Sequence, residues 1–71
     1  MNAQKRIQRF VNENGLSLRQ AALRLECSHY QVFNWTHGYS ETPDRHIRRW
    51  LASEDVAVRE LGKVILADWL E

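Results

Sequence analysis

Five hydrogen-bonding side chains fall within seven consecutive positions of the sequence: Ser28, His29, Tyr30, Gln31 and Asn34. An asparagine or glutamine amide can donate to and accept from the N6 and N7 edge of adenine at the same time. A histidine can donate to guanine N7 or to a phosphate, and a tyrosine can reach a phosphate or lie against a thymine methyl group. These side chains are therefore suited to contact base edges in a major groove, provided that one helix carries them.

Catalytic and metal chemistry have little support in the sequence. Cys27 and His29 form a Cys-x-His pair, but His37 and His46 lie too far along the chain to give zinc-ligand spacing. No histidine or carboxylate forms an acid–base arrangement with a nucleophile. We expect no enzyme activity, no cofactor, no metal and no small-molecule substrate.

The length of 71 residues predicts one small domain spanning 1–71. Cys27 is the only cysteine, which excludes a disulfide scaffold and favours a reducing, cytoplasmic setting. No apolar run approaches the roughly 18 residues of a membrane span, and no signal-peptide pattern precedes the domain, so we expect no membrane contact.

Charge is distributed unevenly along the chain, although the net charge is only +1. Residues 1–53 hold eight basic and four acidic side chains, whereas residues 54–71 hold two basic and five acidic ones. The first part therefore carries +4 and the second −3. This asymmetry favours a basic body that binds a polyanion, with ordinary solvated faces as the alternative.

Helical spacing runs through the whole chain, and no strand-like alternation is present. Ile7, Phe10 and Val11 predict a helix over 3–14 that Gly15 ends in a left-handed conformation. Two capping boxes follow at Ser17–Gln20 and Ser28–Gln31, eleven residues apart. Two capped helices so close together predict a helix-turn-helix over 17–37.

Two further helices are expected after residue 41. Thr42 is predicted to be the N-cap of the fourth helix, with Pro43 at its first position. The fifth helix is expected over 54–70. The predicted core of these helices comprises Ile47, Trp50, Leu51, Val58, Leu61, Ile65 and Trp69, and Arg45, Arg48 and Arg49 are predicted to point outward.

Segment 16–35, with Gly38 and Pro43 after it, resembles the Cro/repressor-type (XRE-like) helix-turn-helix family of phage and bacterial regulators. The resemblance covers about residues 5–52. It implies an all-α, compact, five-helix lambda-repressor-like domain, and a DNA-binding regulator such as a phage Cro-like protein or an anti-CRISPR-associated repressor. It also implies base contacts from Ser28, His29, Tyr30, Gln31 and Asn34, and phosphate contacts from Arg19, Gln20, His37, Tyr39 and Ser40. Arg45 is a further phosphate candidate. For Gln31, capping competes with base contact, and for Phe33, core packing competes with a thymine contact.

The chain departs from the family pattern at three points. Glu26 stands where the turn usually has glycine, so we expect strain or a different turn geometry. Val11 and Thr36 replace an arginine–glutamate pair, and both charges are lost together. The third helix has no lysine or arginine, which removes bidentate guanine recognition from it.

The C-terminal helix has two interpretations. It can close the core of one copy, or it can pair with a second copy through Leu61, Ile65, Leu66, Trp69 and Leu70. We favour the homodimer, since family members bind paired half-sites. The sequence thus predicts a repressor of transcription that binds a double-stranded DNA operator. The alternatives are an antitoxin-like or other protein-interaction module that uses the last helix, and a purely structural helical adaptor.

Overall fold

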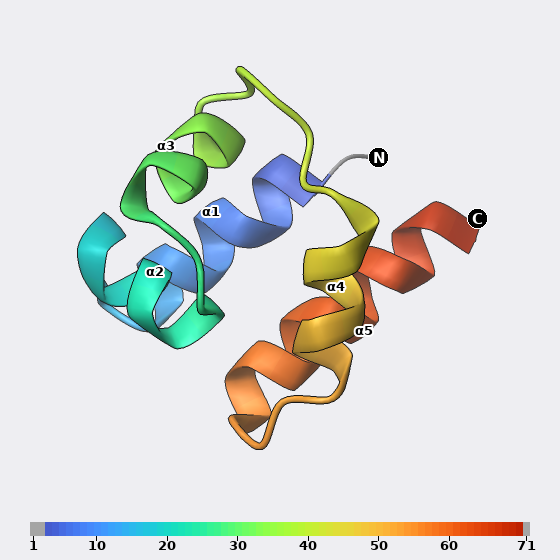
Figure 1. Ribbon diagram of the computed structural model, residues 1–71. Helices are drawn as coiled ribbons and strands as arrows, with labels where there is room; N and C mark the ends of the chain where they lie inside the picture. The colour runs from blue at the N-terminus through green and yellow to red at the C-terminus, as the bar shows by residue number, and fades with distance from the viewer. Residues whose placement is uncertain (1–2, 71) are drawn as a thin grey trace.

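The computed structural model describes residues 3–70, which form five α-helices and no strand. They are α1 (Ala3–Glu13), α2 (Leu18–Leu25), α3 (His29–Thr36), α4 (Asp44–Leu51) and α5 (Val56–Leu70). Figure 1 shows α1 in the middle, with α2 and α3 on one side and α4 and α5 on the other. The all-α, five-helix prediction is confirmed. Within the described residues, no helix has both the length and the apolar character needed to cross a bilayer.

One core joins the two helix pairs to α1. Ile7, Leu25, Val32 and Ile65 have no solvent exposure, and Trp50 is 1% exposed. Two residues predicted for the core lie elsewhere. Leu51 is only half-buried, and Trp69 is 40% exposed because α5 extends past the helices that cover its first turns.

A glycine allows α4 and α5 to approach each other closely. A Cβ atom added to Gly62 would lie 3.1 Å from the backbone nitrogen of Leu51 and 3.3 Å from its side chain. Even an alanine at this position would therefore push the end of α4 away from α5. No local signal marks Gly62, because a glycine inside a helix pattern does not show what it packs against.

The turn between α2 and α3 contains a residue in the left-handed conformation that is not a glycine. Glu26 has φ 55° and ψ 48°, and the amide of Cys27 donates to the carbonyl of Ala22 at 3.0 Å. The different turn geometry allowed by the sequence is not observed. Two contacts hold the turn: the half-buried Cys27 side chain packs against the core, and Arg49 Nη2 of α4 donates to the Glu26 carbonyl at 2.8 Å.

Replacing Glu26 with glycine should raise the free energy of unfolding by about 0.5–1 kcal/mol. A side chain in the left-handed region costs about 1–2 kcal/mol, and the greater freedom of glycine in the unfolded chain offsets part of the gain. Urea denaturation followed by circular dichroism measures this difference. Glu26→Ala is the control, because it removes the charge and keeps the Cβ atom. An equal gain in both variants would contradict the backbone explanation.

Arg49 and Trp50 connect α4 to the end of α2. Arg49 Nη2 and Trp50 Nε1 each donate to the carbonyl of Leu25 at 3.0 Å. The prediction that Arg49 points outward is therefore wrong, because its guanidinium satisfies carbonyls that the end of α2 leaves without helical partners. The same group contacts Nδ1 of His46 at 2.9 Å. Burial, reinforced by the charges of Arg49 and Arg45, lowers the pKa of His46 and keeps the ring neutral.

The two last helices begin differently from the sequence prediction. Pro43, not Thr42, is the N-cap of α4, with φ −63° and ψ 147° and no side-chain capping bond. Thr42 is turned inward, and its Oγ1 is buried without a hydrogen-bond partner among the described residues. At α5, the Asp55 carboxylate accepts from the amides of Ala57 and Val58 at 3.1 and 3.4 Å, so the helix starts at Val56 rather than 54.

Candidate nucleic-acid interface

Both α2 and α3 begin with a complete capping box, as the sequence predicts. Gln20 N donates to Ser17 Oγ at 3.1 Å, and Ser17 N donates to Gln20 Oε1 at 2.9 Å. Ser28 and Gln31 make the same pair of bonds at 3.1 and 3.0 Å. The capping interpretation of Gln31 is confirmed. Because capping occupies the amide oxygens of both glutamines, their amide nitrogens are the groups left to contact another molecule.

The outer face of α3 carries the candidate base-reading residues. Ser28 and His29 are exposed, and Tyr30 is 66% exposed, all at the first turn of the helix. Asn34 lies one turn further along and is half-buried. The side chains of His29, Tyr30 and Asn34 make no hydrogen bond to other described residues. The opposite face of α3 is buried through Val32 and Trp35.

Three aromatic rings are stacked where α3 ends. The rings of Phe33 and His37 are 4.0 Å apart, and those of His37 and Tyr39 are 5.7 Å apart, with interplanar angles of 27° and 24°. Phe33 is the first ring of this stack and is only half-buried, outside the core cluster that its core-packing prediction requires. Its thymine contact stays a prediction. The stack was not predictable from the sequence, because it depends on the path of the loop after α3.

The hydrogen bond of His37 limits what its ring can do. His37 Nδ1 lies 2.8 Å from the carbonyl oxygen of Phe33, which can only accept. In the neutral ring the proton is therefore on Nδ1, and Nε2 is an acceptor that a phosphate would repel. His37 is consequently a poor phosphate ligand in its neutral form, whereas the exposed hydroxyls of Tyr39 and Ser40 can donate.

Helix α1 holds the C-terminal end of α3. The side-chain amides of Gln4 and Gln8 both donate to the carbonyl of Thr36. The next turn contains Gly38 at φ 75°, where an added Cβ would lie 3.0 Å from Gln4 Oε1. These contacts fix the orientation of α3, and none of them follows from local sequence, since the bonded residues are 28 and 32 positions apart.

Several basic side chains form ion pairs with acidic side chains of the same chain. Arg6 binds the Asp68 carboxylate at 2.8 and 3.0 Å, and Arg24 binds that of Asp55 at 2.9 Å through both nitrogens. Hydrogen bonds from these arginines hold the pKa of Asp68 and of Asp55 below the usual range. Part of the acidic C-terminal segment therefore neutralises the basic body directly.

The remaining basic side chains differ in their surroundings. Arg48 forms an exposed ion pair with Asp44 at 2.7 Å. Lys63 pairs with Glu60 at 3.4 Å, and Arg59 Nη1 donates to the carbonyl of Ser53 at 3.2 Å. The basic side chains that are exposed and form no ion pair with the described residues are Lys5, Arg9, Arg19 and Arg45. Arg19 and Arg45 are thus accessible, as a phosphate contact requires.

The thiol of Cys27, in the turn between α2 and α3, has little reactivity. Burial raises the pKa of its thiol to about 11, and the nearby Arg49 charge offsets part of that increase. The thiol is therefore protonated at neutral pH, which fits packing in the turn rather than nucleophilic chemistry. In the described part of the chain, no three histidine, cysteine, aspartate or glutamate side chains are grouped as metal ligands would be.

The residues of α5 predicted for dimerisation fall into a buried group and an exposed group. Leu61 and Ile65 are 4% and 0% exposed and fill the core of a single copy, so they are not available to a second chain. Leu66, Trp69 and Leu70 are 36%, 40% and 79% exposed. The surface left for an interface is thus the last turn and a half of α5.

Comparisons with protein families, with curated proteins and with solved structures find no match to this chain.

Proposed function

We propose that this protein is a sequence-specific regulator that binds double-stranded DNA, and that it represses transcription. In this proposal, α3 enters the major groove. The observation that carries it is a helix held in place by contacts on its inner side, with polar side chains on its outer face that have no hydrogen-bond partner among the described residues. Gln4, Gln8 and the core hold α3, while His29, Tyr30 and Asn34 face outward without hydrogen bonds to other described residues. A rigid helix with such a polar face matches the requirements of direct base readout.

The proposed base contacts follow from the donors and acceptors that remain. Asn34 keeps both its amide oxygen and its amide nitrogen free of internal hydrogen bonds, so it can make the bidentate pair with adenine. His29 and Tyr30 lie at the start of α3, where they can contact a base edge or a phosphate. Gln31 contributes only its amide nitrogen, because its oxygen caps the helix.

Phosphate contacts are assigned to the exposed groups around this face. Arg19 and Gln20 lie at the start of α2, Tyr39 and Ser40 lie in the loop after α3, and Arg45 lies in the first turn of α4. With few accessible cations, the protein relies on neutral donors and on a second DNA-binding copy for affinity.

The homodimer remains part of the proposal, with its contact now restricted to Leu66, Trp69 and Leu70. The double variant Leu66→Ser/Leu70→Ser should be monomeric by sedimentation equilibrium at concentrations where the wild-type chain is dimeric. Both leucines are exposed, so the variant should retain the melting temperature of a folded monomer. A dimer of unchanged strength in this variant would contradict the interface. Truncation after Ser53 is unsuitable as a test, since it removes Leu61 and Ile65 from the core.

The same exposed apolar residues favour a second candidate function, an antitoxin-like or other protein-interaction module. Leu70 is 79% exposed, and an exposed apolar end of a helix is suited to a protein partner as well as to a second copy.

Selection of binding sites from random duplexes separates the two functions. The recovered sequence and a scrambled duplex are then compared across a salt series. The regulator should prefer the selected duplex, with affinity that falls steeply as salt rises. Absence of duplex binding at about 10⁻⁴ M, the weak end of non-specific affinity, would overturn DNA recognition and favour the interaction module.

A further inference from the structure

A cavity of about 740 Å³ opens between the start of α1, the loop that joins α3 to α4, and the end of α5. Its size lies within the range of about 300–1,000 Å³ that small-molecule sites occupy. The described lining residues come from these three segments and from Trp35 of α3, and Glu41 is the only charged one among them. Its carboxylate favours a cation.

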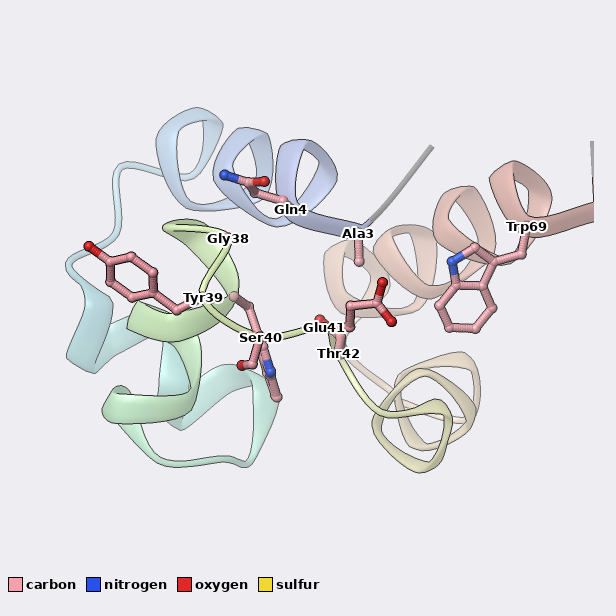
Figure 2. Close-up of a pocket in the computed structure, with 9 residues that line it drawn as sticks. Ala3, Gln4, Gly38, Tyr39, Ser40, Glu41, Thr42 and Trp69 are labelled. Atoms are coloured by element: carbon pink, nitrogen blue, oxygen red, sulfur yellow. The ribbon is translucent and has the colours of Figure 1, made fainter.

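Two side chains on opposite walls of the cavity are suited to hold such a cation. In Figure 2 the Glu41 carboxylate and the Trp69 indole both extend into the space between the loop and α5. Glu41 is exposed and forms no ion pair with the described residues, and Trp69 is 40% exposed. A carboxylate attracts an organic ammonium ion through charge-assisted hydrogen bonds, and an indole ring attracts it through a cation–π contact.

The other walls leave room for a ligand, and one of them contains a buried polar atom without a partner. Ala3 and Gly38 narrow the cavity very little, because they have the smallest side chains. Thr42 Oγ1, which belongs to a lining residue, is buried without a hydrogen-bond partner among the described residues. A buried hydroxyl without a partner is destabilising, and a donor group on a ligand would relieve that.

We propose that this cavity binds a small organic ammonium ion, with its charge between the Glu41 carboxylate and the Trp69 indole. Binding also has a route to the DNA-facing surface, and this part rests on the proposed function. Tyr39 and Ser40 line the cavity, and the Tyr39 ring points away from Glu41 and Trp69. A ligand held on the inner side of the loop thus changes the placement of two proposed phosphate donors.

Titration with phenethylammonium, followed by ¹H–¹⁵N NMR without DNA, tests the site. The indole N–H resonance of Trp69 should shift saturably, and those of the buried Trp35 and Trp50 should move much less. Glu41→Gln should weaken the affinity about tenfold, as expected for loss of a charge-assisted contact. The neutral analogue 2-phenylethanol should bind no better to the wild-type chain than phenethylammonium binds to Glu41→Gln.

Val56→Ser is the matched control, since Val56 is a 60% exposed apolar residue of the same helix that does not line the cavity. It should bind phenethylammonium as the wild-type chain does. Weaker binding in this variant would show that the effect of Glu41→Gln is not specific to the cavity, and would overturn the proposal. Absence of a saturable shift, or unchanged affinity in Glu41→Gln, would overturn it as well.

The second arm measures affinity for the selected duplex with and without phenethylammonium at constant ionic strength. A change that is absent in Glu41→Gln supports the coupling to the loop. An unchanged affinity despite saturation of the cavity overturns the coupling. If the chain binds the amine but no duplex, the proposed function fails while the ammonium site stands.

Discussion

Replacing Trp50 with alanine should lower the free energy of unfolding by about 3–5 kcal/mol, the loss expected when a buried tryptophan is truncated. Trp50 is 1% exposed, its Nε1 donates to the Leu25 carbonyl at 3.0 Å, and its ring meets that of Trp35 edge-on at 5.9 Å. The substitution therefore removes core volume and one of the three hydrogen bonds that fasten α4 to the end of α2 and its C-cap. Urea denaturation followed by circular dichroism measures the effect.

Because the expected effect is so large, a milder substitution at Trp50 should be measured as well. A domain of this length has a total stability of about 0.05–0.15 kcal/mol per residue, so the alanine variant can be largely unfolded in water. Trp50→Phe keeps most of the apolar volume and loses the hydrogen bond, and it should cost about 1–3 kcal/mol. Trp69→Ala is the control, with an expected cost below about 1 kcal/mol, because Trp69 is 40% exposed. Equal costs at Trp50 and Trp69 would contradict this description of the core.

Replacing Asn34 with alanine should relax discrimination at one base pair of the selected duplex by about 1–3 kcal/mol, or about 5- to 150-fold. Alanine favours a helix and Asn34 makes no internal side-chain hydrogen bond, so the fold should be retained. Competition between the selected duplex and its single-base variants measures the discrimination. Melting of the variant chain checks that its fold is intact.

Arg19→Ala is the matched comparison for Asn34→Ala. Arg19 is exposed and forms no ion pair with the described residues, so its proposed role is a phosphate contact. Its loss should weaken binding to all duplexes alike and reduce the slope of log affinity against log salt by about one. The role assignments would be wrong if both variants lost affinity uniformly across duplexes.

Local hydrogen bonding explains which parts of the fold were predictable. The capping boxes at Ser17 and Ser28 join groups three residues apart, and both occur as the sequence predicts. Gly15 has φ 61°, as its place after α1 indicates. Thr42 shows the limit of such reasoning, since the local pattern predicts it as the N-cap of α4, whereas the N-cap is Pro43 and the Thr42 side chain is buried.

The candidate site was predictable only in part. The sequence identifies a polar set on α3, and the structure places Ser28, His29 and Tyr30 on its exposed side. It does not identify the stack of Phe33, His37 and Tyr39, which gives His37 an internal hydrogen bond. The DNA-binding role of these residues stays a prediction.

The sequence by itself determined the all-α class and the limits of most helices, because helical periodicity and caps arise from contacts within about four residues. The uneven charge was also visible in it, but not which charges are accessible. Only the tertiary structure decided that Arg6 binds Asp68, 62 positions away, that Arg24 binds Asp55, and that Arg49 holds the end of α2. The cavity beside Glu41 and Trp69 has the same origin. Packing of the core brings these distant residues together, and no local pattern in the chain encodes that arrangement.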